Sequence, residues 1–247
     1  MMRTLFLQAP SFDGFDGGAG SRYQARREIR SFWYPTWLAQ PAALVEGSTL
    51  IDAPPHGVKL ADIVSRTREF DLAVLHTSAP SFASDVKTVE AMKAANPDLK
   101  AGLIGAKVAV DPSGSLGASR AVDFVAGNEF DFTIKEVAEG REFRSITGLS
   151  WRNAEGSIIH NAPRAVLENM DALPFVTPVY TRDLEIEKYF IGYLKHPYVS
   201  LYTGRVCKSH CTFCLWPTTV GGPRYLNRCV GHVLQALSRA ETAPHQA

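Results

Sequence analysis

Residues 72–105, LAVLHTSAPSFASDVKTVEAMKAANPDLKAGLIG, predict a strand, a helix and a second strand in succession. Leu72–His76 is a short apolar run bounded by turn residues, as expected for a buried strand. Ser84–Asn96 has a helical pattern that ends near Pro97, because a residue before proline disfavours helical dihedrals. Lys100–Gly105 then begins another strand. Alternation of this length predicts an α/β fold with a Rossmann-like, doubly wound parallel sheet.

The same alternation extends in both directions from this stretch. Further strands are predicted at Arg3–Gln8, Ser48–Asp52 and Phe124–Gly127, and further helices at Trp37–Leu44 and Lys59–Arg68. Ligands of such sheets bind outside the carboxyl ends of the strands, so those ends should form one rim suited to a bulky anionic cofactor. The predicted rim consists of Pro10–Gly20, Asp52–Gly57, His76–Phe82 and Gly105–Ala109.

The first rim segment is dense in glycine. Glycines let the backbone approach a ligand closely and let its amides point at an anion, although a merely flexible loop has the same composition. No G-x-G-x-x-G pattern is present, so the usual dinucleotide signature is missing. His76 could be a ligand or a hydrogen-bonded rim residue. The candidate cofactor-binding residues of the rim are Asp16, Gly17, Gly18, Gly20, His76 and Gly105.

Composition excludes several classes of function. The chain has 247 residues, 45% of them hydrophobic, which is enough for one large core or two modest ones. A formal net charge of +1 gives no overall field that would attract nucleic acid. We interpret the basic and aromatic stretch Ser21–Leu38 as a solvated face with core aromatics, not as a nucleic-acid contact. No apolar run is long enough for a signal peptide or a membrane span, so we predict a cytoplasmic location.

A connector follows the parallel sheet. Ile146–Arg152 and Ser157–His160 flank a turn and predict a β-hairpin. Several prolines after it, among them Pro174, indicate an extended connector. We therefore predict a cofactor domain over residues 1–140, a hairpin and linker over 141–191, and a second domain from 192 to 247.

Three cysteines, Cys207, Cys211 and Cys214, follow one another at C-x3-C-x2-C spacing. They come after the apolar run Tyr198–Tyr202, which predicts a strand that delivers a loop. Thiolates on one short loop can hold three irons of a [4Fe–4S] cubane and leave the fourth iron open. A structural zinc site is the alternative. Its fourth ligand would be His210, Cys229 or His232.

A helix is predicted after the cysteine loop, over Arg224–Ala240. We interpret its apolar stripe as core. Cys229 and His232 could share one helix face, where we favour a packing or surface role over metal binding. The stripe consists of Leu226, Val230, Val233, Leu234 and Leu237.

The cysteine loop resembles that of the radical S-adenosylmethionine (SAM) enzymes. Their C-x3-C-x-aromatic-C motif is matched position by position, with Phe213 as the aromatic. The resemblance implies that the three cysteines ligate the cluster, that SAM chelates the open iron, and that Phe213 lies near the adenine. It also implies reductive cleavage of SAM to a 5′-deoxyadenosyl radical, with electrons from a flavodoxin or ferredoxin.

The order of the two predicted domains resembles the cobalamin-binding class of radical SAM proteins. Within that class, Phe12–Trp37, Asp52–Gly57 and Leu201–Gly222 are most similar to hopanoid-biosynthesis-associated members. One departure concerns the Asp-x-His-x-x-Gly motif, whose histidine binds cobalt in other cobalamin domains. Neither Asp13 nor Asp16 is followed by such a histidine, so bound cobalamin should have no histidine ligand from the protein on its lower face.

The hopanoid resemblance implies a substrate and a reaction. The substrate would be an aminosugar-bearing bacteriohopanetetrol, whose sugar ring is contracted to a cyclitol ether, with peripheral membrane contact to reach this lipid. A cobalamin-dependent radical SAM methyltransferase and a non-catalytic corrinoid-binding fragment are the alternatives. Family members build a partial (β/α) barrel after the cysteine loop, and this chain supplies its first strand and helix, so we expect a truncated member.

Overall fold

The computed structural model describes residues 1–12, 32–191, 194–205, 207, 209, 211–214 and 225–241. Its centre is a seven-stranded sheet in the order β2-β1-β3-β4-β5-β6-β7. Strands β1 to β5 are parallel, and β6 and β7 are added antiparallel at one edge. The strands are β1 (Thr4–Gln8), β2 (Thr49–Asp52), β3 (Leu72–His76), β4 (Lys100–Ile104), β5 (Phe124–Ala126), β6 (Leu149–Arg152) and β7 (Ile158–His160).

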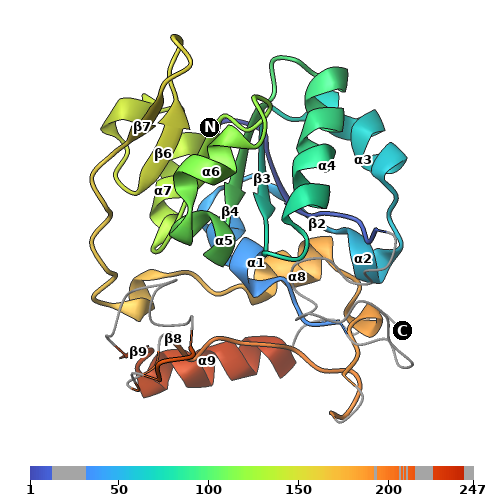
Figure 1. Ribbon diagram of the computed structural model, residues 1–247. Coiled ribbons are helices and arrows are strands. Elements are labelled where there is room, and N and C mark those ends of the chain that lie inside the picture. The colour runs from blue at the N-terminus through green and yellow to red at the C-terminus, as the bar shows by residue number, and fades with distance from the viewer. Residues whose placement is uncertain are drawn as a thin grey trace.

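Helices cover both faces of the sheet, as Figure 1 shows. The α-helices are α1 (Thr36–Leu44), α2 (Ala53–His56), α3 (Leu60–Arg66), α4 (Phe82–Ala95), α5 (Ala106–Val110), α6 (Pro112–Gly117), α7 (Phe130–Ala138), α8 (Thr177–Asp183) and α9 (Val230–Glu241). Short 3₁₀ helices are η2 (Thr67–Glu69), η3 (Phe143–Ser145), η4 (Met170–Ala172) and η5 (Ile186–Lys188).

The central strands are buried on both faces, which explains their continuous apolar runs. In β3, Leu72 and Val74 pack with residues of α1, α7 and α8, whereas Ala73 and Leu75 pack with residues of α3, α4, α5 and α6. All four side chains are fully buried. The α/β prediction with a parallel sheet is therefore confirmed.

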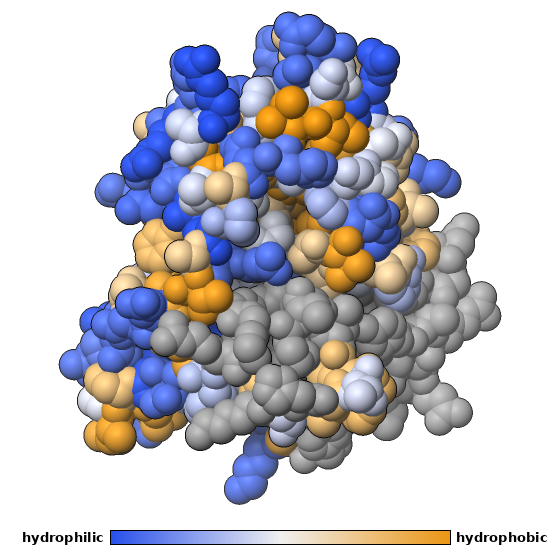
Figure 2. Space-filling view, turned by 60° about the vertical axis from the view of Figure 1, so that its left-hand side comes forward, coloured by the Kyte–Doolittle hydropathy of each residue, from blue (hydrophilic) through white to orange (hydrophobic). Residues whose placement is uncertain are grey.

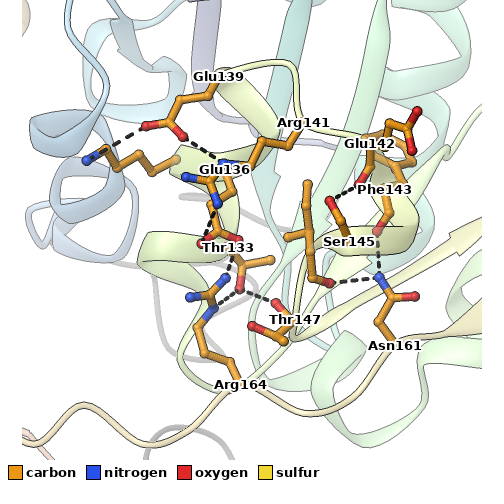
Figure 3. A network of polar contacts seen from close by, with 12 residues as sticks. Thr133, Glu136, Glu139, Arg141, Glu142, Phe143, Ser145, Thr147, Asn161 and Arg164 are labelled. Carbon is orange, nitrogen blue, oxygen red and sulfur yellow. Dashed lines mark hydrogen bonds and ion pairs between the residues drawn. The ribbon is translucent and has the colours of Figure 1, made fainter.

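The hairpin predicted after the parallel strands is present, and it continues the sheet. β6 pairs with β5, so that Trp151 lies opposite Phe124. The chain that leaves the hairpin is fixed to α7: the Arg164 side chain donates to Thr133 Oγ1 at 2.7 Å and pairs with Glu136, as Figure 3 shows. The hairpin is thus bonded into the main sheet, while the predicted domain boundaries at 140 and 191 stay predictions.

The connector after the hairpin is less extended than predicted. It contains the helix α8, whose Tyr180 is 1% exposed and packs in the core. Proline is tolerated in the first turn of a helix, where its missing N–H has no intrahelical partner, so Pro178 starts this helix instead of breaking it.

The predicted strand at Tyr198–Tyr202 is wrong. These residues have no regular secondary structure, and the strand β8 (Gly204–Arg205) follows them, paired with β9 (Leu226–Asn227) in a separate two-stranded sheet. The apolar run has another cause: Tyr198 is packed edge-on against Tyr34 at 5.4 Å between ring centroids. The Tyr34 hydroxyl donates to the Tyr198 carbonyl at 2.8 Å, and no described strand pairs with that backbone.

The apolar stripe of α9 is not core in the described structure. Val230 is 75% exposed and Leu234 is 61% exposed, and Ala236 is the buried residue of this helix. Figure 2 shows hydrophobic residues reaching the surface of the lower part of the molecule, where Figure 1 places α9. No helix of the described ranges is both long and apolar enough to cross a bilayer.

Candidate functional site

The strand order fixes where a ligand of the sheet should bind. β1 has β2 on one side and β3 on the other. Successive strands are therefore added in one direction from β1 to β2 and in the opposite direction from β3 onwards, so the switch point lies between β1 and β3. In open α/β sheets, ligands bind outside the carboxyl ends of the strands at this switch point. Gln8 ends β1 and His76 ends β3, so these two residues flank it.

Gln8 brings a buried donor to the switch point. Its side chain is 3% exposed, and its Nε2 has no acceptor among the described residues. A buried amide without a partner costs free energy, so such a group is a reason to look for a ligand. The sequence did not predict Gln8 as a site residue, because one glutamine at the end of a strand forms no pattern.

His76 adds a neutral ring to the same place. Burial lowers its pKa to about 4, because removal from water penalises the charged form. At neutral pH the ring therefore has one nitrogen that can accept a hydrogen bond or bind a metal. His76 thus lies where the sequence predicted it, and its role as a ligand stays a prediction.

Gly105 lies directly beside His76. Its φ of +123° belongs to a region that only glycine adopts readily. A Cβ at this position would collide with the carbonyl oxygen of Thr77 and lie 3.1 Å from the His76 ring. The structure therefore brings these two candidate residues together, and close packing of β4 against β3 is sufficient reason for the glycine.

A polar network that the sequence did not predict shapes the loop after β3. Asp85 of α4 accepts hydrogen bonds from Thr77 Oγ1 at 2.6 Å and from Ser81 Oγ at 2.8 Å. Burial raises the pKa of Asp85 to about 7, although these two donors oppose the shift. The network holds the loop at the switch point in one conformation. In the sequence, this network could be recognised from Thr77 and Ser81, which lie between the strand β3 and Asp85 of α4.

The end of β2 faces the C-terminal part of the chain. Tyr189 donates its hydroxyl hydrogen to Asp52 at 2.8 Å, and both side chains are buried. Burial raises the pKa of Asp52 to about 7. His56 Nε2 accepts from the backbone N–H of Glu185 at 3.1 Å. Asp52 and His56 of the predicted rim therefore bind protein groups.

The cysteine loop is open to solvent. Cys207, Cys211 and Cys214 are exposed, and Phe213 is 91% exposed. The backbone N–H of Ser209 donates to Cys207 Sγ at 3.4 Å, which lowers the pKa of that thiol and favours the thiolate. Exposed thiols on one loop, one of them favoured as thiolate, are the donor set that an iron–sulfur cluster requires.

A single zinc ion would need the thiols close together. In a tetrahedral site with Zn–S bonds of about 2.3 Å, the sulfurs lie about 3.8 Å apart. The three loop thiols do not all lie within 4.8 Å of one another in the described structure. Cys229 and His232 instead group with Asp171. The cysteine loop and the group of Asp171, Cys229 and His232 are therefore two separate candidate sites in the described part of the chain.

Arg205, two residues before Cys207, joins the loop to the sheet. Arg205 Nη1 lies 2.6 Å from Asp131 Oδ2 and 3.5 Å from Glu129 Oε2, just beyond β5. All three side chains are at most 5% exposed. The segment that leads into the cysteine loop is thus fixed at the carboxyl end of the sheet, the end that carries the switch point.

Four predicted residues of the glycine-rich segment, and His210, lie outside the described part of the chain, so their roles stay predictions. The four are Asp16, Gly17, Gly18 and Gly20.

Comparison with known proteins gives matches among solved structures. No protein-family model and no curated protein sequence matches the chain. The cobalamin-dependent S-adenosylmethionine radical enzyme OxsB, with aqua-cobalamin and S-adenosylmethionine bound, matches with a TM-score of 0.68 and 14% identity over 98% of this chain. Apo, selenomethionine-labelled OxsB matches with a TM-score of 0.67 and 16% identity over 97% of this chain. The chain shares its fold with part of OxsB.

That part is 32% of the solved OxsB chain in the first structure and 31% in the apo structure. At such low identity the likeness establishes the fold and no residue roles. It includes both the parallel sheet and the C-terminal segment, because nearly the whole of this chain is aligned. The fold is therefore a Rossmann-like, mostly parallel α/β sheet of the kind found in this part of OxsB.

Proposed function

We propose that this chain is a cobalamin-binding radical SAM protein, in which the sheet binds cobalamin and the loop cysteines bind a [4Fe–4S] cluster. One observation carries the proposal: the buried pair of Arg205 and Asp131 attaches the segment before the cysteines to the carboxyl end of the sheet. Two sites whose cofactors must work together would thereby lie at one end of the molecule.

The loop residues would hold the cluster. Cys207, Cys211 and Cys214 would each ligate one iron, and the Ser209 N–H would stabilise the thiolate of Cys207. Phe213 would offer its exposed ring to the adenine of SAM. When bound, the cluster and SAM supply one-electron reduction and radical formation.

The switch point would hold the corrinoid. Gln8 would donate from its buried amide to a polar group of the ligand, which would satisfy the Nε2 hydrogens. His76 would offer the free nitrogen of a neutral ring as a hydrogen-bond acceptor, and not as a ligand of cobalt. The Thr77 and Ser81 network would keep the loop after β3 in place, so that little conformational entropy is lost on binding.

The cluster is tested by anaerobic reconstitution of the full chain with iron and sulfide, followed by EPR of the reduced protein with and without SAM. We expect a [4Fe–4S]⁺ signal that changes when SAM is added. Serine in place of Cys207, Cys211 or Cys214 should remove the cluster, whereas the matched variant Cys229→Ser should retain it. A Cys229→Ser variant without a cluster, or a loop variant with one, would contradict the ligand assignment.

Corrinoid binding is tested separately, by titration with hydroxocobalamin followed by absorption spectroscopy. We expect binding in which no histidine ligates cobalt, and at least tenfold weaker binding by Gln8→Leu. Binding of cobalamin by a chain that shows no SAM-dependent change in its cluster signal would favour the alternative, a corrinoid-binding module. No binding at all would refute the role of the switch point.

We further propose a substrate class. The likeness to hopanoid-associated radical SAM proteins supports ring contraction of an aminosugar-bearing bacteriohopanetetrol to a cyclitol ether, with a flavodoxin or ferredoxin as electron donor and contact with the membrane surface. The test is mass spectrometry of lipid extracts after deletion of the gene. Accumulation of the aminosugar lipid and loss of the cyclitol ether are expected. An unchanged hopanoid profile would remove this substrate, and a missing methyl group on another product would support the methyltransferase.

A further inference from the structure

We propose that Asp171, Cys229 and His232 bind a divalent ion of the zinc class, at a site separate from the cysteine loop. Asp171 lies in η4, Cys229 directly precedes α9, and His232 lies in the first turn of α9. One ligand atom of each residue lies within 4.8 Å of the other two. A carboxylate, a thiol and an imidazole thus lie together, although Asp171 and Cys229 are 58 positions apart in the sequence.

The distances between the ligand atoms fit one tetrahedral ion. Cys229 Sγ lies 3.3 Å from His232 Nδ1, and His232 Nδ1 lies 3.6 Å from Asp171 Oδ2. Zinc bonds of about 2.3 Å to sulfur and about 2.0–2.1 Å to nitrogen and oxygen place neighbouring tetrahedral ligands about 3.4–3.6 Å apart. An ion could therefore enter with small side-chain shifts.

The donor set selects the class of metal. Thiolate and imidazole together favour zinc among the common divalent ions, because magnesium and calcium prefer oxygen ligands. Zinc accepts a carboxylate as a third ligand. Three protein ligands leave one coordination position for water or another small ligand.

The segment that carries Asp171 is already fixed to the start of α9 without a metal. The Asn169 side chain accepts from the Asp171 N–H at 2.9 Å, which holds the η4 turn. Arg228 donates to the Leu173 carbonyl at 3.0 Å and to the Pro174 carbonyl at 3.2 Å. Since these bonds place the ligands in advance, binding would cost little conformational entropy.

An aromatic ring lies beside the histidine ligand. Phe175 lies with its ring centroid 5.6 Å from that of His232, and the guanidinium of Arg239 is 5.0 Å from the Phe175 centroid. These contacts restrict the rotation of the imidazole. A bound ion would add a cross-link between η4 and α9 and would stabilise the folded chain by mass action.

A metal-free explanation of the same contacts exists. The backbone N–H of Cys229 donates to both carboxylate oxygens of Asp171 at 3.2 Å, so Asp171 also caps the start of α9. Capping explains why Asp171 lies at this helix end. Cys229 Sγ also accepts from the His232 N–H at 3.5 Å, so capping accounts for the thiol as well. It gives no reason for an imidazole beside the same carboxylate, so the test must report on the metal itself.

The chain offers a selective experiment because it contains four cysteines. In a variant with serine at Cys207, Cys211 and Cys214, Cys229 is the one thiol left, and the three replaced side chains are exposed, so the fold should persist. Titration with Co²⁺, whose spectrum reports tetrahedral geometry and thiolate ligation, then examines this site alone. Circular dichroism verifies folding of each variant.

We expect one Co²⁺ per chain, with a thiolate-to-metal charge-transfer band, and displacement of Co²⁺ by Zn²⁺. In the same background, Cys229→Ser should abolish the band, and Asp171→Asn and His232→Gln should each weaken binding at least tenfold. Asp171→Asn retains a capping oxygen, so it separates metal binding from capping. His160→Gln is the control and should change nothing. Equal Co²⁺ affinity in all variants, or a spectrum without the thiolate band, would overturn the proposal, whatever the loop cysteines bind.

Discussion

Arg205 Nη1 lies 2.6 Å from Asp131 Oδ2, and the side chains of both residues are at most 3% exposed. Glu129 shares the same guanidinium at 3.5 Å. Burial raises the pKa of Glu129, Arg205 opposes this rise, and the neighbouring charge of Asp131 adds to it. This buried group is the electrostatic link between the sheet and the segment before the cysteines.

Replacing the arginine should therefore detach that segment or unfold the protein. Arg205→Met leaves Asp131 buried without a counter-charge, and breaking a buried pair in this way costs about 3–5 kcal/mol. Urea unfolding measures the loss, and hydrogen exchange at the Arg228 N–H, which donates to Thr203 at 2.9 Å, reports local detachment. The control is Arg144→Met, whose exposed pair with Glu142 should contribute less than about 1 kcal/mol. Equal effects of the two variants would show that the buried pair is not a special link.

A second prediction concerns the glycine beside His76. Gly105→Ala should destabilise the protein. The φ of +123°, which alanine disfavours, costs about 1–3 kcal/mol, and the collision of the new Cβ with the Thr77 carbonyl oxygen adds to this cost. Gly117→Ala is the matched control: a Cβ there meets nothing within 4 Å, so it should be neutral or stabilise by about 0.4–1 kcal/mol. Thermal unfolding of the two variants and of the unmodified protein compares these stabilities. A tolerated alanine at position 105 would mean that this turn can rearrange.

The sequence predicted some segments of the fold correctly and others wrongly, because an apolar run can have more than one structural cause. Strands β1 to β5 are apolar runs between helical patterns, and their positions were predicted to within a residue or two. Tyr198–Tyr202 has the same apolar signal for a different reason: Tyr198 packs on Tyr34, Tyr202 packs on Trp37, and no described strand pairs with this segment. An apolar run indicates that a segment is buried, but it does not show whether that segment pairs with a strand or packs by its side chains alone.

The same limit applies to the site. The cysteine motif is readable because its spacing is local, whereas Gln8 and the Arg205–Asp131 pair depend on contacts between distant segments. Asp171 is the clearest case: the sequence suggested Cys229 and His232 as neighbours on a helix, and their third partner lies in the connector. Long-range partners of this kind leave no periodic pattern to find.

A third prediction concerns the buried carboxyl of Asp85, whose pKa is raised to about 7. In the unfolded chain this group ionises near 3.9, so between about pH 4 and pH 7 the folded state keeps a proton that the unfolded state has lost. Its contribution to stability is therefore present at low pH and falls as the pH rises through about 7. Asp85→Asn stays neutral and keeps an oxygen for the Thr77 and Ser81 donors.

Urea unfolding at several pH values tests this sign. Relative to the unmodified protein, Asp85→Asn should gain stability as the pH rises from about 4 to about 7. Asp52→Asn should behave in the same way, since the pKa of Asp52 is also raised to about 7. Asp98→Asn, at an exposed carboxyl, is the control variant. A pH-independent difference for Asp85→Asn would mean that the carboxyl is solvated.

The ring of His76 should have the opposite pH dependence, in a partly overlapping range. Its folded pKa is lowered to about 4, whereas an unfolded histidine titrates near 6.5. Below about pH 6.5 the unfolded chain therefore binds a proton that the folded chain excludes, and stability is lost as the pH falls towards 4. His76→Gln removes the titrating group, so it should lose less stability than the unmodified protein over this range. His160→Gln, at an exposed histidine, is the control variant. NMR titration of the His76 ring should give a midpoint near 4. A midpoint near 6.5 would mean that water reaches the ring, so that the switch point is not the desolvated site that the cobalamin proposal assumes.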